Sequence, residues 1–379
     1  MARRQRGRHR SALRRSAALF CLVAVLWGAP QLRQALSALL SGAAVVSTAI
    51  TMPEGAVVTL RQRFAPELYD PDAEQDGPEK EVPQAPPPVS ENSGEKSGGS
   101  YQEQTERSAP DIPEEYRAPL LERTMDGEEN PAFYSYKEGW IRNYTALDAQ
   151  KLNTLLSGEW EGPAGQDGEV QILIYHTHAT ESYESSPGEY YDLRSTWRST
   201  DDTQNMVAVG EALKEALEAE GFTVLHDTTQ HDYPSYNGSY ERSCETVESY
   251  LKQYPGITVL LDLHRDAILY EDNTVLKPVV QTEAGKAAQI MIAVGWDPGG
   301  DSNPHWQQNL RFAAELNARA QADTPGLMRP VYFIERTYNQ FLSPGALLLE
   351  FGSNGNTLEE AKLAAKLLAP SLAAVLRGE

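Results

Sequence analysis

The stretch VQILIYHTH, residues 170–178, decides the fold class. An unbroken apolar run of this length, rich in β-branched residues, is typical of a strand buried on both faces, as in the centre of a parallel sheet. Two histidines, His176 and His178, follow it directly. The stretch therefore predicts a parallel sheet with ionisable side chains at the end of a central strand.

Strand and helix patterns alternate along the rest of the chain after residue 169. Helical spacing of apolar residues is found at 205–220, 240–253, 306–322 and 357–376, and short apolar runs typical of strands at 222–227, 257–266, 286–295, 331–336 and 346–352. Residues 116–158 mix strand-like segments with a short helix and form a lead-in. Such alternation predicts a single α/β domain over residues 116–379, with a mostly parallel sheet and helices on both faces.

The N-terminus carries a targeting signal. Seven arginines crowd the first fifteen residues, and an uncharged apolar run, 16–29, follows them. That run has the length of a signal-peptide core, and a second apolar run at 35–50 would extend it into an uncleaved anchor. Under both interpretations, residues 1–50 form a membrane anchor or signal segment, and all later residues lie outside the cytoplasm.

Residues 51–115 read as a linker, most clearly from 69 to 113. Pro, Glu, Ser, Gly and Gln dominate there, and apolar side chains are scarce. Such a composition buries too little apolar surface to offset the entropy of ordering. We expect a disordered tether between a membrane segment and a working domain.

Charge and cysteine content exclude some functions. The formal net charge is −21, so the phosphates of DNA or RNA would repel the protein. The two cysteines, Cys21 and Cys244, lie far apart and form no CxxC motif. Any bound metal must therefore be held by His, Asp or Glu.

Three predicted strands end in ionisable residues. ILIYHTH ends at His178, LLDLHRD contains His264, and LLLEFGSN contains Glu350. In open parallel sheets, function gathers beyond the carboxyl ends of the strands. Imidazole and carboxylate groups are ligands that suit zinc, and a free carboxylate beside a zinc-bound water can act as a general base. The three strand ends together predict a hydrolytic zinc site.

Four segments carry a resemblance to a known family. These are YHTHATES (175–182), the run from Asp201 to Asn205, DLHRDA (262–267) and LLEFGSNGNT (348–357). Together they resemble the stage II sporulation protein P family over residues 116–379. That family is distantly similar to the zinc N-acetylmuramoyl-L-alanine amidases, so the resemblance implies an amidase-like fold.

The resemblance also implies roles for residues. Zinc would be held by His178, Asp201 and His264, and Glu350 would be the general base. Alternatives stay open: Glu181 and Asp202 compete with Asp201 for the acidic ligand position, and His176 would be an alternate or supporting ligand. The remaining candidates are Asp262, Arg265 and Asp266 around the ligand histidine, and Asn354 for binding substrate.

The activity implied is cleavage of the amide between muramic acid and L-alanine in peptidoglycan, with an endopeptidase cut at the peptide crosslinks left open. By resemblance, the protein would act in forespore engulfment beside the sporulation proteins D and M of the same stage. Its catalytic domain would lie in the space between the sporangial membranes.

Two rival functions fit the sequence less well. A serine hydrolase would need G-x-S-x-G, but Ser353 directly follows Gly352, and no histidine lies downstream. A membrane-tethered scaffold that binds peptidoglycan without cutting it predicts the loss of His178, His264 or Glu350. All three are present, which favours the enzyme.

Overall fold

A computed structural model describes residues 112–128, 131–160, 162, 171–184, 188–193, 195, 197–270, 273–300 and 302–379. The predicted N-terminal membrane segment and nearly all of the predicted linker lie outside these residues. Within the described ranges, no helix combines the length and apolar character needed to cross a membrane.

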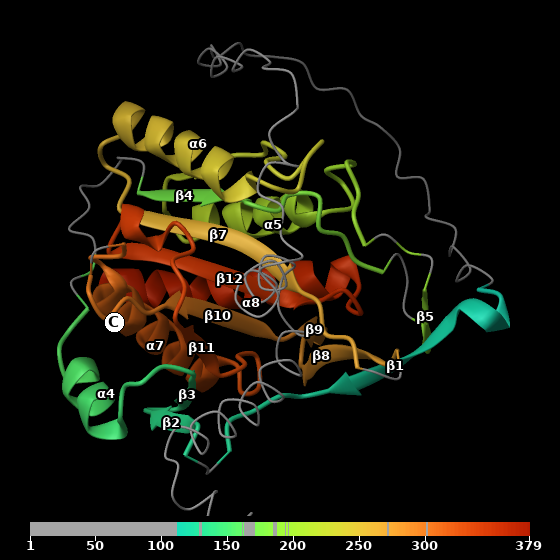
Figure 1. Ribbon diagram of the computed structural model, residues 1–379, viewed down its shortest axis with the longest axis horizontal. Helices are drawn as coiled ribbons and strands as arrows, with labels where there is room; N and C mark the ends of the chain where they lie inside the picture. Colours follow the sequence, from blue (N-terminus) through green and yellow to red (C-terminus); the bar gives the residue numbers. More distant parts are fainter. Residues whose placement is uncertain are drawn as a thin grey trace, which may run out of the picture. The chain divides into compact units, whose positions relative to one another are not determined.

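The core of the domain is an eight-stranded sheet (Figure 1). Its spatial order is β2 (Phe133–Tyr136), β3 (Gly139–Asn143), β11 (Val331–Ile334), β10 (Ile290–Gly295), β12 (Gly345–Ser353), β7 (Val259–Asp266), β4 (Ile172–Tyr175) and β6 (Val224–His226). All pairings are parallel except β2–β3 and β10–β12. The prediction of a mixed α/β domain with a mostly parallel sheet is confirmed.

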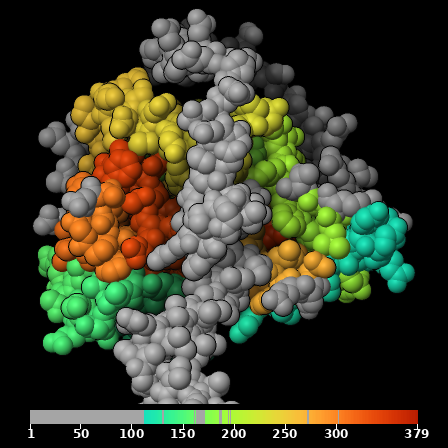
Figure 2. Space-filling view, viewed as in Figure 1, coloured from blue at the N-terminus to red at the C-terminus, as the bar shows by residue number. Residues whose placement is uncertain are grey.

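Helices cover both faces of this sheet, as predicted. α5 (Met206–Ala219), α7 (Trp306–Asp323) and α8 (Leu358–Arg377) share one apolar core with the sheet, whereas α6 (Ser239–Gln253) packs on the opposite face (Figure 1). The short helix α4 (Ala149–Leu156) lies against α7, green beside orange in Figure 2.

Local sequence explains where these helices begin. The Asn205 side chain accepts a hydrogen bond from the amide of Val207 at the start of α5. At the start of α8, Thr357 and Glu360 form the predicted capping box, in which each side chain bonds the other's backbone amide. The two helices are thus fixed directly after the segments that carry the candidate site.

The alternation of side chains along β7 prepares the site. Leu261 and Leu263 belong to the core under α5, α7 and α8, while Leu260 packs with Val247 of α6. Successive strand residues point to opposite faces, so His264 lies on the α6 face. The two faces therefore differ most at the carboxyl end, where one stays apolar and the other becomes polar.

A second, four-stranded sheet was not predicted. Its order is β5 (Tyr190–Asp192), β1 (Arg117–Arg123), β8 (Val275–Thr282) and β9 (Gly285–Ala288). The single strand predicted over 286–295 is therefore wrong: it is divided between β9 and β10, in different sheets. Gln289 lies between them: its backbone amide donates to Pro278 of β8, its carbonyl oxygen accepts from Gly352 of β12, and its buried side chain bonds the backbone of Met125 and Gly326.

Candidate active site

His264 and Glu350 are neighbours on adjacent strands. The parallel pairing of β7 and β12 places Glu350 opposite His264. Paired residues of parallel strands project from the same face, so both side chains lie on the α6 face. They are almost fully buried, at 1% and 3% exposure. Two of the three residues that carried the sequence argument therefore meet.

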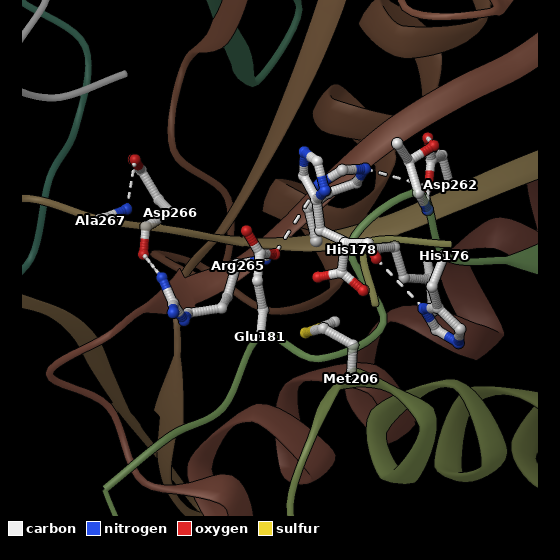
Figure 3. A network of polar contacts seen from close by, with 12 residues as sticks. His176, His178, Glu181, Met206, Asp262, Arg265, Asp266 and Ala267 are labelled. Carbon is white, nitrogen blue, oxygen red and sulfur yellow. Dashed lines mark hydrogen bonds and ion pairs between the residues drawn. The ribbon is translucent and has the colours of Figure 1, made fainter. Parts of the chain in front are cut away.

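His178 joins them from the turn that follows β4 (Figure 3). Its ring lies edge-on to that of His264 at a centroid distance of 5.1 Å, and stacks on Tyr236 at 4.5 Å. Its Nδ1 lies 3.4 Å from the hydroxyl of Ser239, the first residue of α6. Its Nε2 is buried and has no protein hydrogen-bond partner.

His264 stands between two carboxylates. Its Nδ1 lies 3.7 Å from Glu181 Oε2, and its Nε2 lies 3.0 Å from Asp262 Oδ1. These are ion-pair distances, and neither contact meets the criteria of a hydrogen bond. Asp262 is held in turn by the amide and hydroxyl of Thr177, at 2.8 and 2.7 Å. Glu181 is held by the amide of Arg265, at 3.0 Å.

Burial and neighbouring charges shift the pKa values of the site. Burial, reinforced by Asp266, raises the pKa of Glu350 to about 8. Burial alone would lower the pKa of His264, but the adjacent Asp262 carboxylate outweighs it and raises that pKa to about 10. The pKa of His178 falls well below its usual value because of burial and the charge of His264.

The site contains buried polar atoms that make no hydrogen bond within the protein. They are Nε2 of His178, both ring nitrogens of His264 and Oε2 of Glu350. Buried polar atoms are nearly always paired, so such a cluster calls for a ligand or solvent. Its imidazole and carboxylate groups fit zinc in kind. Among the described residues, no three His, Cys, Asp or Glu side chains are already arranged around a common metal position.

The structure separates the rival acidic residues. Asp201 is exposed, and its carboxylate accepts hydrogen bonds from the amide and hydroxyl of Thr203. Asp202 is also exposed and accepts a hydrogen bond from Gln230, at 2.8 Å. Glu181, in contrast, is buried and lies beside His264. Of the three, Glu181 is the one placed against a candidate ligand.

His176 takes part in a different network. Its Nδ1 lies 3.1 Å from the carbonyl oxygen of Leu263, and its Nε2 lies 2.9 Å from Nε2 of His226. His226 in turn contacts Glu211 of α5, at 3.0 Å. β4 ends at Tyr175 and a turn follows, so His176 and His178 do not lie on one continuous strand.

Arg265 and Asp266 organise the loops around the site. The guanidinium of Arg265 donates to the backbone carbonyls of Ser182 and Trp197, at 2.9 and 2.7 Å. Asp266 forms a buried ion pair with Arg329, at 2.9 Å. The Arg265 contacts fasten the segment that follows Glu181 to the end of β7.

Asn354 lies in the turn after β12. Its Oδ1 accepts a hydrogen bond from the amide of Ile268, at 3.3 Å. Its Nδ2 is buried without a protein hydrogen-bond partner. The Oδ1 atom of Asn354 thus stabilises the turn, and its Nδ2 group remains able to donate a hydrogen bond to a bound molecule.

Sequence reasoning missed the contribution of α6. Tyr236, Ser239 and Tyr240 all approach His178 from the start of this helix. The available signal was the tyrosine-rich run YPSYNGSY (233–240), directly before a helical pattern. The sequence does not show that this run lies near the site, because that depends on α6 packing over the sheet face that carries His264 and Glu350.

Comparison with solved structures finds amidases. The N-acetylmuramyl-L-alanine amidase Ami1 from Mycobacterium smegmatis is 11% identical, with a TM-score of 0.33, over 56% of this chain and 100% of that one. AmiC2 of Nostoc punctiforme is 12% identical, with a TM-score of 0.33, over 56% of this chain and 98% of that one. The CwlD amidase from Clostridioides difficile, solved in complex with the GerS lipoprotein, is 9% identical, with a TM-score of 0.33, over 55% of this chain and 97% of that one.

Comparison at the level of sequence is more specific. Stage II sporulation protein P of Bacillus subtilis (strain 168) is 29% identical over 264 residues, which cover 65% of this chain and 61% of the relative. The match thus spans less than two thirds of that relative's length. The family model described as stage II sporulation protein P matches residues 65–373, most of the chain. The chain therefore belongs to the stage II sporulation protein P family.

Proposed function

We propose that this protein is a zinc-dependent peptidoglycan hydrolase that cuts the amide bond between N-acetylmuramic acid and L-alanine during sporulation. Family membership supports the role in sporulation. The choice of bond rests on the motif resemblance to zinc amidases. A further cut at peptide crosslinks is the alternative bond for the same site.

The observation that carries the proposal is the buried cluster at the ends of β4, β7 and β12. His178, His264 and Glu350 come from three separate segments and meet on one face, where Nε2 of His178 and Oε2 of Glu350 are buried without a hydrogen bond within the protein. A purely structural cluster would pair these atoms internally, because an unmade buried hydrogen bond costs about 1–3 kcal/mol. Retaining them unpaired is the behaviour expected of a binding site.

In this proposal His178, His264 and Glu181 hold the metal, with Asp201 as the alternative acidic ligand. When bound, zinc would polarise the scissile carbonyl and acidify the attacking water. Asp262 faces the other nitrogen of His264 and orients its ring, and Ser239 does the same for His178. Such pairs keep each imidazole aimed into the site.

Glu350 moves the proton. As a carboxylate it would accept a proton from the attacking water and then donate it to the leaving amine. Burial raises the pKa of Glu350 to about 8 in the metal-free protein. This carboxyl group can therefore both gain and lose a proton near neutral pH.

We further propose that residues 1–50 tether the protein to a membrane and that the catalytic domain works outside the cytoplasm. The arginine cluster before an apolar run and the polar, proline-rich linker support this. The proposed partners are the sporulation proteins D and M, on the strength of the family resemblance alone.

The test uses the purified full chain, loaded with zinc and incubated with purified sacculi. Mass spectrometry should find released peptides with a new L-alanine amino terminus. Glu350→Gln should keep its zinc and lose cleavage by a factor of about 10² or more. Release of peptides cut only at the crosslinks would contradict the amidase assignment, and binding without release would favour the scaffold.

Metal analysis separates the two acidic candidates. Glu181→Gln should reduce bound zinc, while Asp201→Asn, the matched control, should bind as much zinc as the wild type. The reverse result would assign the ligand to Asp201 and would require its loop to rearrange. A wild-type chain without zinc even after zinc is supplied would refute the metal proposal.

A further inference from the structure

Tyr240 covers the two histidines of the proposed site. Its ring is nearly parallel to that of His264, with centroids 6.4 Å apart and planes 17° apart. The same ring stands edge-on to His178, at 5.6 Å and 85°. Tyr240 is the second residue of α6 and is partly accessible to solvent, so it forms a wall of the site that a substrate can reach.

The backbone of Tyr240 is firmly held. The Asn339 side chain donates hydrogen bonds to the carbonyl oxygen of Tyr240, at 2.9 Å, and to the hydroxyl of Ser243, at 3.0 Å. Ser243 lies 2.8 Å from the hydroxyl of Thr177, which also binds Asp262. The position of Tyr240 is thus tied to the carboxylate that orients His264.

A strained turn supports this wall. Tyr338 and Asn339 have φ angles of 38° and 51°, in the left-handed region that non-glycine residues seldom adopt. The turn places the Tyr338 ring 6.4 Å from that of Tyr240 and aims Asn339 at the start of α6. Strained backbone of this kind costs about 1–3 kcal/mol per residue and is concentrated at functional sites.

The Tyr240 ring lies against the histidine that pairs with the proposed general base. His264 stands opposite Glu350 across the β7–β12 pairing, and the Tyr240 ring is nearly parallel to that of His264. A tyrosine hydroxyl carries its proton at neutral pH and can donate a hydrogen bond. Tyr240 therefore brings a neutral hydrogen-bond donor to the face that holds the two histidines.

We propose that Tyr240 donates a hydrogen bond to the carbonyl oxygen of the scissile amide, with Tyr338 bracing its ring. This rests on the proposed hydrolase function. As water adds to the carbonyl carbon, the C=O π electrons move to oxygen and the water proton passes to Glu350. The C–N bond then breaks, and Glu350 returns the proton to the nitrogen. Tyr240 keeps its own proton throughout and stabilises the negative oxygen.

The test is Tyr240→Phe in the zinc-loaded full chain, with soluble muropeptides as substrate. Removing one oxyanion donor typically lowers kcat by about 10²–10³-fold. We expect a loss of about 10² in kcat, with KM, zinc content and melting temperature unchanged. A non-cleavable phosphonamidate analogue of the muramoyl-alanine bond should also bind about 10²-fold more weakly, because its charged oxygen mimics the transition state.

Tyr250→Phe is the matched control, since Tyr250 lies on the same helix with its hydroxyl 3.4 Å from Asp227. It should leave all of these measurements unchanged. An active wild type with a Tyr240→Phe variant within about twofold of it in kcat would overturn the inference alone. Loss of zinc or a lower melting temperature in that variant would also overturn it, by showing a structural role. A wild type that cleaves nothing would instead reject the proposed function.

Discussion

The two faces of β7 show how one strand serves two purposes. Leu261 and Leu263 belong to the apolar core shared with α5, α7 and α8. Asp262 and His264 alternate with them and face α6. On the first face stability comes from buried apolar area, and on the second buried charges must be compensated by specific partners. The apolar face therefore holds the register in which His264 stands opposite Glu350.

The largest expected effect on stability is on the core face. Leu263→Ala removes a fully buried side chain and should lower the free energy of unfolding by about 2–5 kcal/mol. Urea unfolding of the metal-free protein measures this. Leu121→Ala is the control, because Leu121 is 45% exposed, and should change stability by less than about 0.5 kcal/mol. Equal losses of stability in the two variants would contradict the claim that the apolar face of β7 stabilises the fold.

A smaller effect is expected where α5 meets the His176–His226 pair. A Cβ added to Gly210 would lie 2.4 Å from Nε2 of His226 and 2.7 Å from Nε2 of His176, so the rings must move. Gly210→Ala should lower the free energy of unfolding by about 1–3 kcal/mol. In Gly188→Ala, the control, the nearest atom would be at 3.5 Å, and little change is expected. An unchanged Gly210→Ala protein would show that the histidine pair adapts freely.

The smallest expected effect is a pH dependence of the polar face. The pKa of Glu350 is raised to about 8 in the folded, metal-free protein, from an ordinary value of 4.5. The protonated form is therefore favoured by folding, and this stabilisation is complete below pH 4.5 and is lost as the pH rises towards 8. Glu350→Gln has no carboxyl group to titrate at this position, so only the wild type loses this stabilisation. The free energy of unfolding of Glu350→Gln, relative to that of the wild type, should therefore increase between pH 5 and pH 8. Parallel stability curves for the two proteins over that range would contradict the assigned shift.

Particular segments show how far sequence reasoning reached. The apolar runs at 172–175 and 259–263, the second interrupted by Asp262, are strands, as predicted, because burial on both faces leaves few other arrangements for such residues. The β9–β10 segment defeated the prediction, because its pattern contains no break. The change of sheet at Gln289 depends on contacts with Met125, Gly326 and Gly352, which are distant in sequence.

The residues of the chain alone were enough to predict the α/β class, the three strands that lead to His178, His264 and Glu350, and the capping of α8. These features depend on side-chain periodicity and on residues close together in the chain. Only the tertiary structure decided that Glu181 lies beside His264, that His176 joins His226, and that Tyr240 covers the two site histidines. Those contacts depend on where loops and helix ends lie in space, and the cross-strand register that sets this arises from packing of the whole sheet.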